Sequence, residues 1–142
     1  LLIASTEAQF ADTHARVGIL PGWGLSQKLP RLIGIGRAKE LSFTGNYLSA
    51  EQAERWGLVN RVVAPEELLP TCLALAADMA SCVPDVLQGY KRVMDAGYGT
   101  TLAEGLKCEA GESRRHFETV SPGMVSERRK NVQKRGRSQG EN

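Results

Sequence analysis

The segment "FADTHARVGILPGWG", residues 10–24, constrains the fold of this chain more than any other stretch. It interrupts apolar residues with three glycines and with Pro21. Glycine permits backbone conformations and close ligand approaches that a side chain forbids, so this pattern predicts an irregular loop. The loop leads directly into a helical pattern, and the free N–H groups at a helix start can hold a developing negative charge. The alternative is a plain turn from loop to helix.

His14 is the candidate chemical group in this loop. A histidine there can act as a general acid or base near neutral pH. The alternative is a loop histidine that hydrogen bonds to the backbone or to Asp12. Arg16 can form a local ion pair with Asp12 or meet a phosphate. Trp23 can stack on a ring or anchor the helix that follows, and the residues alone leave these alternatives open.

Residues 1–64 mix short strands, loops and helices. Continuous apolar residues predict a buried strand, alternation with β-branched residues predicts a short strand, and glycines mark the helix ends. Ser49 and Gln52 form a capping box. The expected elements are a strand at 1–4, a turn and short strand at 7–10, a short or bent helix from 25 to Gly34, a helix at about 37–43, a helix from 49 to Gly57, and a strand at 58–63.

Residues 65–142 form an almost wholly helical extension. Pro84 begins one helix, and Thr101 with Glu104 forms a capping box at the start of the next. The final stretch "SERRKNVQKRGRSQGEN" is basic and polar, and we expect it to fray. Lys130 and Lys134 belong to this basic run, whose charges can meet a phosphate or simply form a solvated face.

The composition is that of an ordinary globular domain. The chain has 142 residues, of which 42% are hydrophobic and 24% charged, and its formal net charge is +2. This balance does not favour binding to nucleic acid or to a membrane surface. Three widely spaced cysteines argue against a disulfide framework and against a cysteine-based metal site. We therefore expect an intracellular protein with no metal; the residues do not choose among cytoplasm, mitochondrion and peroxisome.

The order of residues from position 10 to 63 resembles the crotonase superfamily, the enoyl-CoA hydratase and isomerase family. Its characteristic pattern combines a glycine and proline loop, an "LPR.IG" helix, an "LTG" turn and a "GLVN.VV" strand. The matching positions are Phe10, Gly18, Pro21, Gly24, Leu29, Pro30, Ile33, Gly34, Ala38, Glu40, Leu41, Thr44, Gly45, Ala50, Ala53, Gly57, Leu58, Val59, Asn60, Val62 and Val63. A helical C-terminal extension also follows in the family, so the resemblance covers essentially the whole chain.

The resemblance implies an α/β fold, a spiral of ββα repeats, of which residues 1–64 are the C-terminal part and residues 65–142 a helical oligomerisation extension. Members bind acyl-CoA thioesters and form trimers or hexamers. Two backbone N–H groups form an oxyanion hole for the thioester enolate, and in hydratases two glutamates add water to a double bond. Coenzyme A enters as part of the substrate, and no separate cofactor is implied. Lys130 and Lys134 are weak candidates for contacts to its phosphates.

The chain departs from the family pattern at the position of the second glutamate, which His14 occupies. The family's first glutamate and oxyanion-hole segment lie upstream of Leu1, so we expect an N-terminally incomplete chain that is inactive alone. Pro21, Gly22 and Trp23 fall beside the expected acyl site. Trp23 replaces a small residue and implies a differently shaped acyl pocket.

Three functions remain open from the sequence. The first is an enoyl-CoA hydratase that holds the thioester enolate in an oxyanion hole. The second is a related protein with isomerase or other thioester chemistry, or a non-catalytic, truncated protein that only forms trimers. Binding of RNA through the basic C-terminus is a weaker third, against which the nearly neutral net charge argues.

Overall fold

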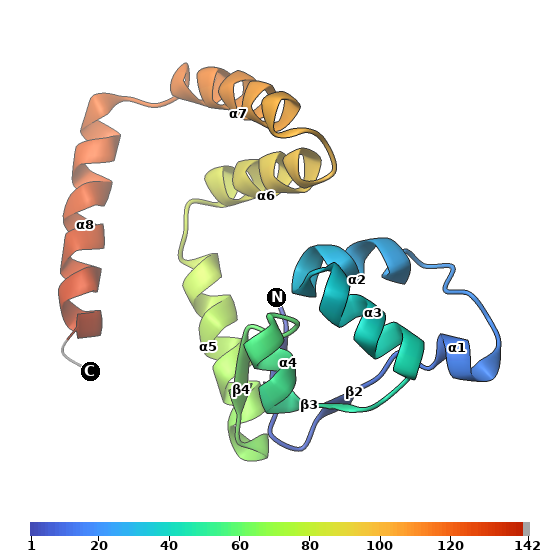
Figure 1. Ribbon diagram of the computed structural model, residues 1–142. Coiled ribbons are helices and arrows are strands. Elements are labelled where there is room, and N and C mark those ends of the chain that lie inside the picture. Colours follow the sequence, from blue (N-terminus) through green and yellow to red (C-terminus); the bar gives the residue numbers. More distant parts are fainter. Residues whose placement is uncertain (141–142) are drawn as a thin grey trace. The chain divides into compact units, whose positions relative to one another are not determined.

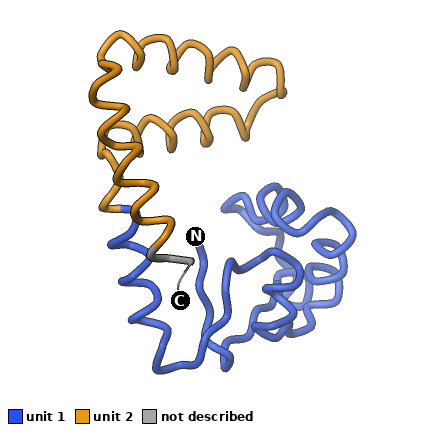
Figure 2. Tube along the Cα trace, turned by 90° about the vertical axis from the view of Figure 1, so that its left-hand side faces the viewer, with its two compact units in different colours: residues 1–79 blue, residues 80–142 orange. Residues whose placement is uncertain are grey.

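A computed structural model describes residues 1–140 of the chain. The chain forms two compact units, residues 1–79 and the residues from 80 on, and each is described by itself (Figure 2). We predicted a boundary at residue 64, where strands give way to helices. The two compact units divide after Met79. The boundary at residue 64 between a spiral core and a helical extension stays a prediction.

Four short strands hold the first unit together in two pairs. Strand β1 (Ile3–Ser5) runs parallel to β4 (Arg61–Val63), with Ala4 opposite Val62. Strand β2 (Gln9–Phe10) runs antiparallel to β3 (Leu48–Ser49). Parallel strands need a long crossover connection, and the helices between β2 and β4 supply it (Figure 1).

Four helices of the first unit lie between these strands: α1 (His14–Val17), α2 (Leu25–Ile33), α3 (Ile35–Thr44) and α4 (Ala50–Trp56). Helix α4 begins as predicted, because the Ser49 hydroxyl accepts a hydrogen bond from the Gln52 N–H at 3.2 Å. The Gln52 side chain does not complete the capping box and instead accepts from Arg55. Helix α1 was not predicted, since residues 11–24 were expected to be irregular throughout.

The core of the first unit consists of small and medium apolar side chains. Ala50 and Ala53 of α4 are completely buried, and helices α2 and α3 each contribute a pair of side chains from one face. The buried apolar residues are Ala4, Leu29, Ile33, Ala38, Leu41, Leu48, Ala50, Ala53 and Val59. This core fixes α2 and α3 together and so positions the loop that connects β2 to α2.

Helix α5 (Leu68–Ala80) follows a single turn of 3-10 helix, η1 (Pro65–Glu67), and carries the chain into the second unit. There, α6 (Pro84–Tyr98) and α7 (Leu102–Phe117) form a hairpin of helices (Figure 1). Pro84 starts α6, and Thr101 and Glu104 form a reciprocal capping box at α7, as the sequence predicted. The hairpin closes tightly, because a Cβ at Gly105 would lie 3.4 Å from the Cα of Gly97.

The last helix, α8 (Pro122–Gly140), contains most of the basic segment that we expect to fray. Its residues are helical through position 140, and Arg135 donates a hydrogen bond to the Ser81 hydroxyl at 3.2 Å. The final two residues of the expected tail lie outside the described residues. No disulfide forms in the described part of the chain, and Cys72 is half-buried.

No single helix among residues 1–140 is both long and apolar enough to cross a membrane. The bent pair of α5, together with the turn before it, and α6 has the required length and composition only when the two are taken together.

Candidate functional site

Asp12 is the buried charged residue of the structure's described part, with only 6% of its surface exposed. One of its oxygens, Oδ1, accepts a hydrogen bond from the backbone N–H of His14 at 3.2 Å. The same oxygen lies 2.7 Å from Nδ1 of the His14 ring. Carboxylates are rarely buried unless they are paired, so these contacts account for its position.

Hydrogen bonds keep Asp12 ionised in spite of its burial. Burial acts to raise the pKa of Asp12, but hydrogen bonds from the Ser42 side chain and from the side chain and backbone of His14 outweigh it and lower that pKa below its ordinary value. Ser42 belongs to α3, so the carboxylate ties the loop to a helix of the core. Arg16, expected as a local partner of Asp12 or of a phosphate, instead donates from Nε to the carbonyl of Thr44 at 2.6 Å.

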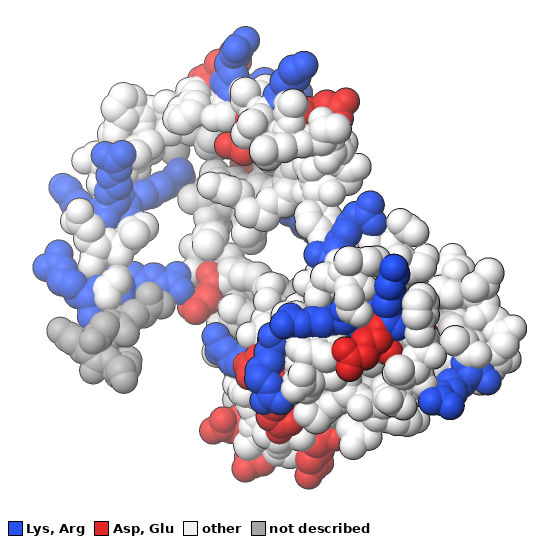
Figure 3. Space-filling model, in the orientation of Figure 1, with Lys and Arg blue, Asp and Glu red and all other residues white. Residues whose placement is uncertain are grey.

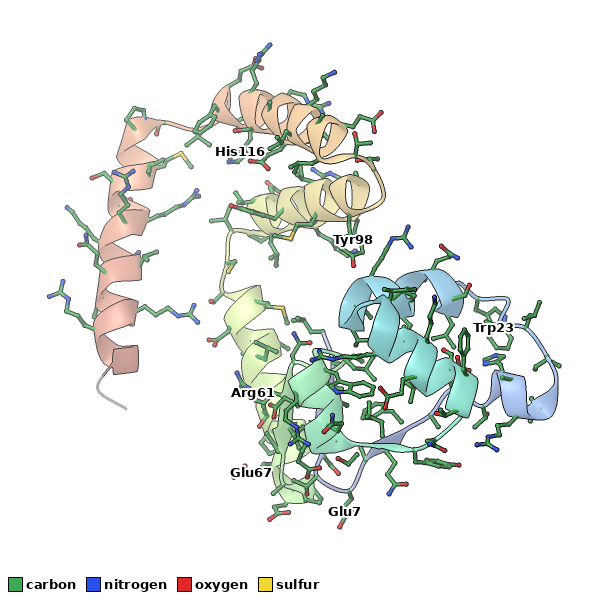
Figure 4. All side chains as sticks on the ribbon, in the orientation of Figure 1. Glu7, Trp23, Arg61, Glu67, Tyr98 and His116 are labelled. Carbon is green, nitrogen blue, oxygen red and sulfur yellow. The ribbon has the colours of Figure 1, made fainter. Side chains whose placement is uncertain are left out.

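His14 begins the short helix α1 and remains partly accessible, with 21% of its side chain exposed. Its ring meets the Trp23 ring edge-on, with the centroids 6.2 Å apart. Figure 4 labels Trp23 on the loop between α1 and α2. Among the described residues, the ring makes its hydrogen bond through Nδ1 to Asp12, which leaves Nε2 available. The structure therefore contains the hydrogen bond to Asp12 that the sequence offered as the alternative to a chemical role.

A groove of about 310 Å³ lies beside this pair, and its lining includes both Asp12 and His14. Its walls are mainly apolar side chains from the loop, α2 and α3, and its other polar members come from α2 and α3. The apolar residues that line it are Ala15, Ile19, Leu20, Pro21, Leu25, Leu29, Pro30, Ile35, Ala38 and Phe43, and the other polar ones are Ser26, Lys39 and Ser42. A mainly apolar groove with a few polar groups is typical of small-molecule sites.

The turn into α2 has the form that the sequence predicted. Gly24 adopts a φ of +85°, which strongly favours glycine, and no side chain caps the helix. The N–H groups of Leu25 and Ser26 have no hydrogen-bond partner within residues 1–140. Both residues line the groove, so the unpaired start of α2 lies at its wall.

Only one of the three residues expected beside an acyl chain lines the groove. Pro21 lines the groove. Gly22 and Trp23 are not among its lining residues, and 84% of Trp23 is exposed on the loop between α1 and α2. Trp23 does contact the ring of His14, which lines the groove.

Lys130 and Lys134 lie on α8, in the second unit, and both are exposed. Figure 3 shows basic side chains gathered along this helix. The groove belongs to the first unit and α8 to the second. A contact of these two lysines with the phosphates of coenzyme A stays a prediction.

The second unit has a larger cleft, of about 910 Å³, between α6 and α7. Glu109, Glu112 and His116 line it together with Tyr90 and Met94. Figure 4 labels His116 on α7. No group of three or more histidine, cysteine or acidic side chains within the described residues is arranged to hold a metal ion. The cleft is the larger of the two, but it lacks the buried, hydrogen-bonded carboxylate that distinguishes the groove in the first unit.

Sequence reasoning missed Ser42 and the contribution of α3 to the groove. Ser42 precedes Phe43 within an ordinary helical pattern, and nothing in that pattern marks it as a partner of Asp12. Ser42 can be identified only from the folded structure, in which α3 packs beside the loop.

Comparison with known proteins finds a match to the family model for enoyl-CoA hydratase/isomerase over residues 1–135. A probable enoyl-CoA hydratase of Mycobacterium leprae is 41% identical over 106 residues, which cover 75% of this chain and 41% of that relative. The chain thus spans less than half the length of this curated relative.

Solved structures give the same fold. An enoyl-CoA hydratase from Bacillus anthracis has a TM-score of 0.83 and 32% identity, covering 93% of this chain and 50% of the other. A protein of Thermobifida fusca, named as a candidate enoyl-CoA hydratase and solved with acetoacetyl-CoA, has a TM-score of 0.77 and 26% identity over 83% of this chain and 46% of its own. The fold is therefore crotonase-like, an α/β arrangement rich in helices.

Proposed function

Since the chain belongs to the enoyl-CoA hydratase/isomerase family, we propose that the protein adds water to the double bond of a 2-enoyl-CoA thioester. The observation that carries this proposal is the family match over residues 1–135, which includes the groove beside Asp12 and His14. The relative solved with acetoacetyl-CoA supports an acyl-CoA thioester as the substrate class. Coenzyme A is then part of the substrate, and no other cofactor is required.

Hydration of an enoyl thioester needs one base, one acid and a site for negative charge. The base takes a proton from water, and the water oxygen bonds to C3. The electron pair of the double bond moves to C2 and the thioester oxygen as an enolate, and a proton delivered to C2 restores the thioester. We assign the proton-transfer role within this chain to His14, whose Nε2 is available at the groove.

The remaining groups of this reaction come from outside the chain's 142 residues in our proposal. The family's first glutamate and its oxyanion-hole segment precede the position that corresponds to Leu1. The complete protein would supply both, and the unpaired N–H groups at the start of α2 form part of the polar wall that faces the thioester. The chain alone is accordingly expected to be inactive.

The apolar groove fits an acyl chain, and Pro21 belongs to its wall. Trp23 contacts the ring of His14, and Gly22 links Pro21 to Trp23 in the loop. In this arrangement Trp23 limits the space beside His14. Trp23→Ala is expected to change the preference for acyl-chain length, measured as kcat/KM over a series of enoyl-CoA substrates. An unchanged preference would show that Trp23 does not influence the acyl site.

The helices of the second unit and the lysines of α8 have roles in the complete assembly. We propose a homotrimer or hexamer in which the helical extension meets its copies, with Lys130 and Lys134 near the phosphates of coenzyme A. Their exposure and charge suit that contact. The protein is intracellular in this proposal, because coenzyme A thioesters are metabolites of the cell interior.

A specific observation also favours double-bond isomerisation as a second candidate. An imidazole paired with a carboxylate can take a proton from one carbon and return it to another, and this requires no attack by water. The two reactions differ in their product: hydration removes the conjugated double bond, whereas isomerisation of a 3-enoyl thioester creates one.

The test is an assay of the complete protein on crotonyl-CoA and on a 3-enoyl-CoA, with His14→Ala beside the wild type. We expect hydration, and a loss of about 10²-fold or more in kcat for His14→Ala. His116→Ala is the matched control, because it removes the chain's other histidine, which lies in the second unit. Activity that His14→Ala leaves intact would remove His14 from the mechanism, and turnover of neither substrate would favour a non-catalytic protein.

A further inference from the structure

The carboxylate of Asp12 is held on two sides, by elements that are far apart in the sequence. The loop contacts it through the backbone and ring of His14. Ser42 of helix α3 lines the same groove, and its hydroxyl is one of the hydrogen-bonding groups that lower the pKa of Asp12. A buried carboxylate with hydrogen bonds from both the loop and the core has one orientation, and so does any ring that is bonded to it.

We propose that Asp12 is a positioning residue that fixes the tautomer of His14, holding the proton on Nδ1 so that Nε2 is the base that faces the substrate. This proposal rests on the proposed function, in which His14 moves a proton. An ionised carboxylate can only accept a hydrogen bond, so the ring nitrogen 2.7 Å from it carries a hydrogen. In a neutral imidazole the other nitrogen then has the lone pair.

The consequence for the reaction is a complete proton cycle on one ring. Nε2 takes a proton from the water that attacks C3, and the ring becomes an imidazolium with a hydrogen on each nitrogen. Asp12 stays ionised throughout and stabilises this charge from the Nδ1 side. Nε2 later returns its proton to the substrate carbon. The neutral ring with its carboxylate thus takes the place of the anionic glutamate that the family pattern has at this position.

The charged groups around the pair are compatible with this role. Burial and hydrogen bonding together leave the pKa of Asp12 lowered, so its carboxylate is ionised at neutral pH. Lys39 of α3 is the other charged residue among those that line the groove. Arg16 of α1 is engaged by the carbonyl of Thr44 and does not compete with His14 for the carboxylate.

The alternative to a positioning role is that Asp12 only stabilises the fold of the loop. Its Oδ1 accepts the N–H of His14 two residues later, a turn that aspartate and asparagine form equally well. The substitution Asp12→Asn would keep the acceptor oxygen and the shape of the side chain while losing the negative charge. The substitution Asp12→Ala would lose the turn and the ring contact together. The two substitutions therefore distinguish turn formation from action on the imidazole.

The first measurement reads the tautomer directly and does not depend on activity. The complete protein is labelled with ¹⁵N-histidine, and the His14 signals are identified by their absence in His14→Ala. At a pH where the ring is neutral, we expect the hydrogen on Nδ1 in the wild type and a shift towards the Nε2–H form in Asp12→Ala. A wild-type ring with its hydrogen on Nε2, or a tautomer that Asp12→Ala leaves unchanged, would overturn the proposal.

The second measurement is kinetic, on crotonyl-CoA. Asp12→Asn is expected to lower kcat by about 10²-fold with KM changed by less than about threefold, because charge on the ring appears only during the reaction. Asp12→Asn combined with His14→Ala should be no slower than His14→Ala alone, since the two act as one unit. Asp95→Asn, which changes an exposed aspartate on α6, is the matched control.

Each remaining outcome decides a separate claim. A kcat for Asp12→Asn within about twofold of the wild type, in a protein whose melting temperature is unchanged, would overturn the positioning role. Independent, additive losses in the double variant would do the same. A wild type that turns over no enoyl-CoA would defeat the proposed function, while the ¹⁵N spectra would still decide whether Asp12 sets the tautomer.

Discussion

The two units of this chain differ in how much of each is buried. Every buried residue of the described chain lies in the first unit, where Ala50 and Ala53 have no exposed surface at all. In the second unit, α6 and α7 contain no buried residue, and even large apolar side chains such as Tyr90 and Met94 are more than half exposed. The first unit thus has a core of its own, whereas the second consists of helices with open apolar faces.

This difference shows which parts of the structure the chain can determine by itself. In the first unit, packing fixes the loop, α2 and α3, and hence the groove. In the second, the helices are defined by local signals such as the capping box at Thr101, and their large apolar side chains remain exposed. Contiguous exposed apolar side chains indicate a surface that a partner covers. The site is therefore built on the unit with a core, and the proposed assembly depends on the other unit.

The largest expected effect is that of a charge in the core of the first unit. Ala53 has no exposed surface, and Ala53→Asp would bury a carboxylate without a partner. We expect it to cost more than about 3 kcal/mol and to unfold the first unit, measured by urea denaturation of the complete protein. Ala110→Asp, on an exposed position of α7, is the matched control and should change stability little. An equal loss of unfolding free energy in Ala53→Asp and Ala110→Asp would contradict the difference in burial between the two units.

The next prediction places a charge on an open face of the second unit. Leu106 of α7 is 55% exposed, so Leu106→Asp should change the folding free energy by only about 0.5 kcal/mol. Its expected effect is on assembly instead: the proposed trimer or hexamer should dissociate, as measured by light scattering. Lys107→Asp introduces the same side chain at the next position and should leave the assembly intact. An unchanged mass for Leu106→Asp would exclude this face from the interface.

The elements that could be predicted from sequence are those with local causes. Ser49 and Thr101 begin their helices through hydrogen bonds to residues three positions on, and Pro84 starts α6 because its missing N–H is not needed there. The strand expected at 58–63 is shorter and begins at Arg61. Just before it, the Asn60 side chain accepts a hydrogen bond from the Leu2 N–H at 2.8 Å. Such a long-range contact leaves no local pattern.

The candidate site shows the same division between local and long-range causes. His14 could be found from its position in the loop and from the family resemblance, and Asp12 from its closeness in sequence. Ser42 could not be found, because it reaches Asp12 only after α3 packs on the core. Helix α1 was missed because the glycines and proline of this segment indicate a loop. In the structure, the Asp12 side chain accepts a hydrogen bond from the His14 N–H, and a single turn of helix begins at His14.

A smaller effect is expected where the backbone requires glycine. Gly45 ends α3 with a φ of +62°, and an added Cβ would lie 2.6 Å from Cγ of Arg16. Gly45→Ala should cost about 1–2 kcal/mol, measured by urea denaturation. Gly111→Ala in α7 is the contrasting change, since a Cβ there meets nothing within 4 Å and the helix favours alanine. It should stabilise α7 by about 0.5–1 kcal/mol, and a loss there would reveal a covered surface at Gly111.

The smallest effects concern a carboxylate at the start of a helix in each unit. Hydrogen bonds from the hydroxyl and backbone N–H of Thr101 lower the pKa of Glu104 in α7. In α4, hydrogen bonds from its own backbone N–H and from Ser49 lower the pKa of Glu51. A group whose pKa is lower in the folded state adds stability above its unfolded value and loses that contribution as the pH falls through its folded value.

Glu104→Ala and Glu51→Ala should therefore destabilise the protein slightly at neutral pH. The difference from the wild type should shrink as the pH falls below the ordinary glutamate value of 4.5. Urea denaturation at a series of pH values measures both. Because the two carboxylates are fully exposed and held by local bonds, their effects should be alike even though only one unit has a core. If the difference in unfolding free energy between either variant and the wild type grew in acid, that glutamate would be paired differently from the hydrogen bonds described. If only Glu51→Ala changed the unfolding free energy, the capping box of α7 would contribute nothing to folding.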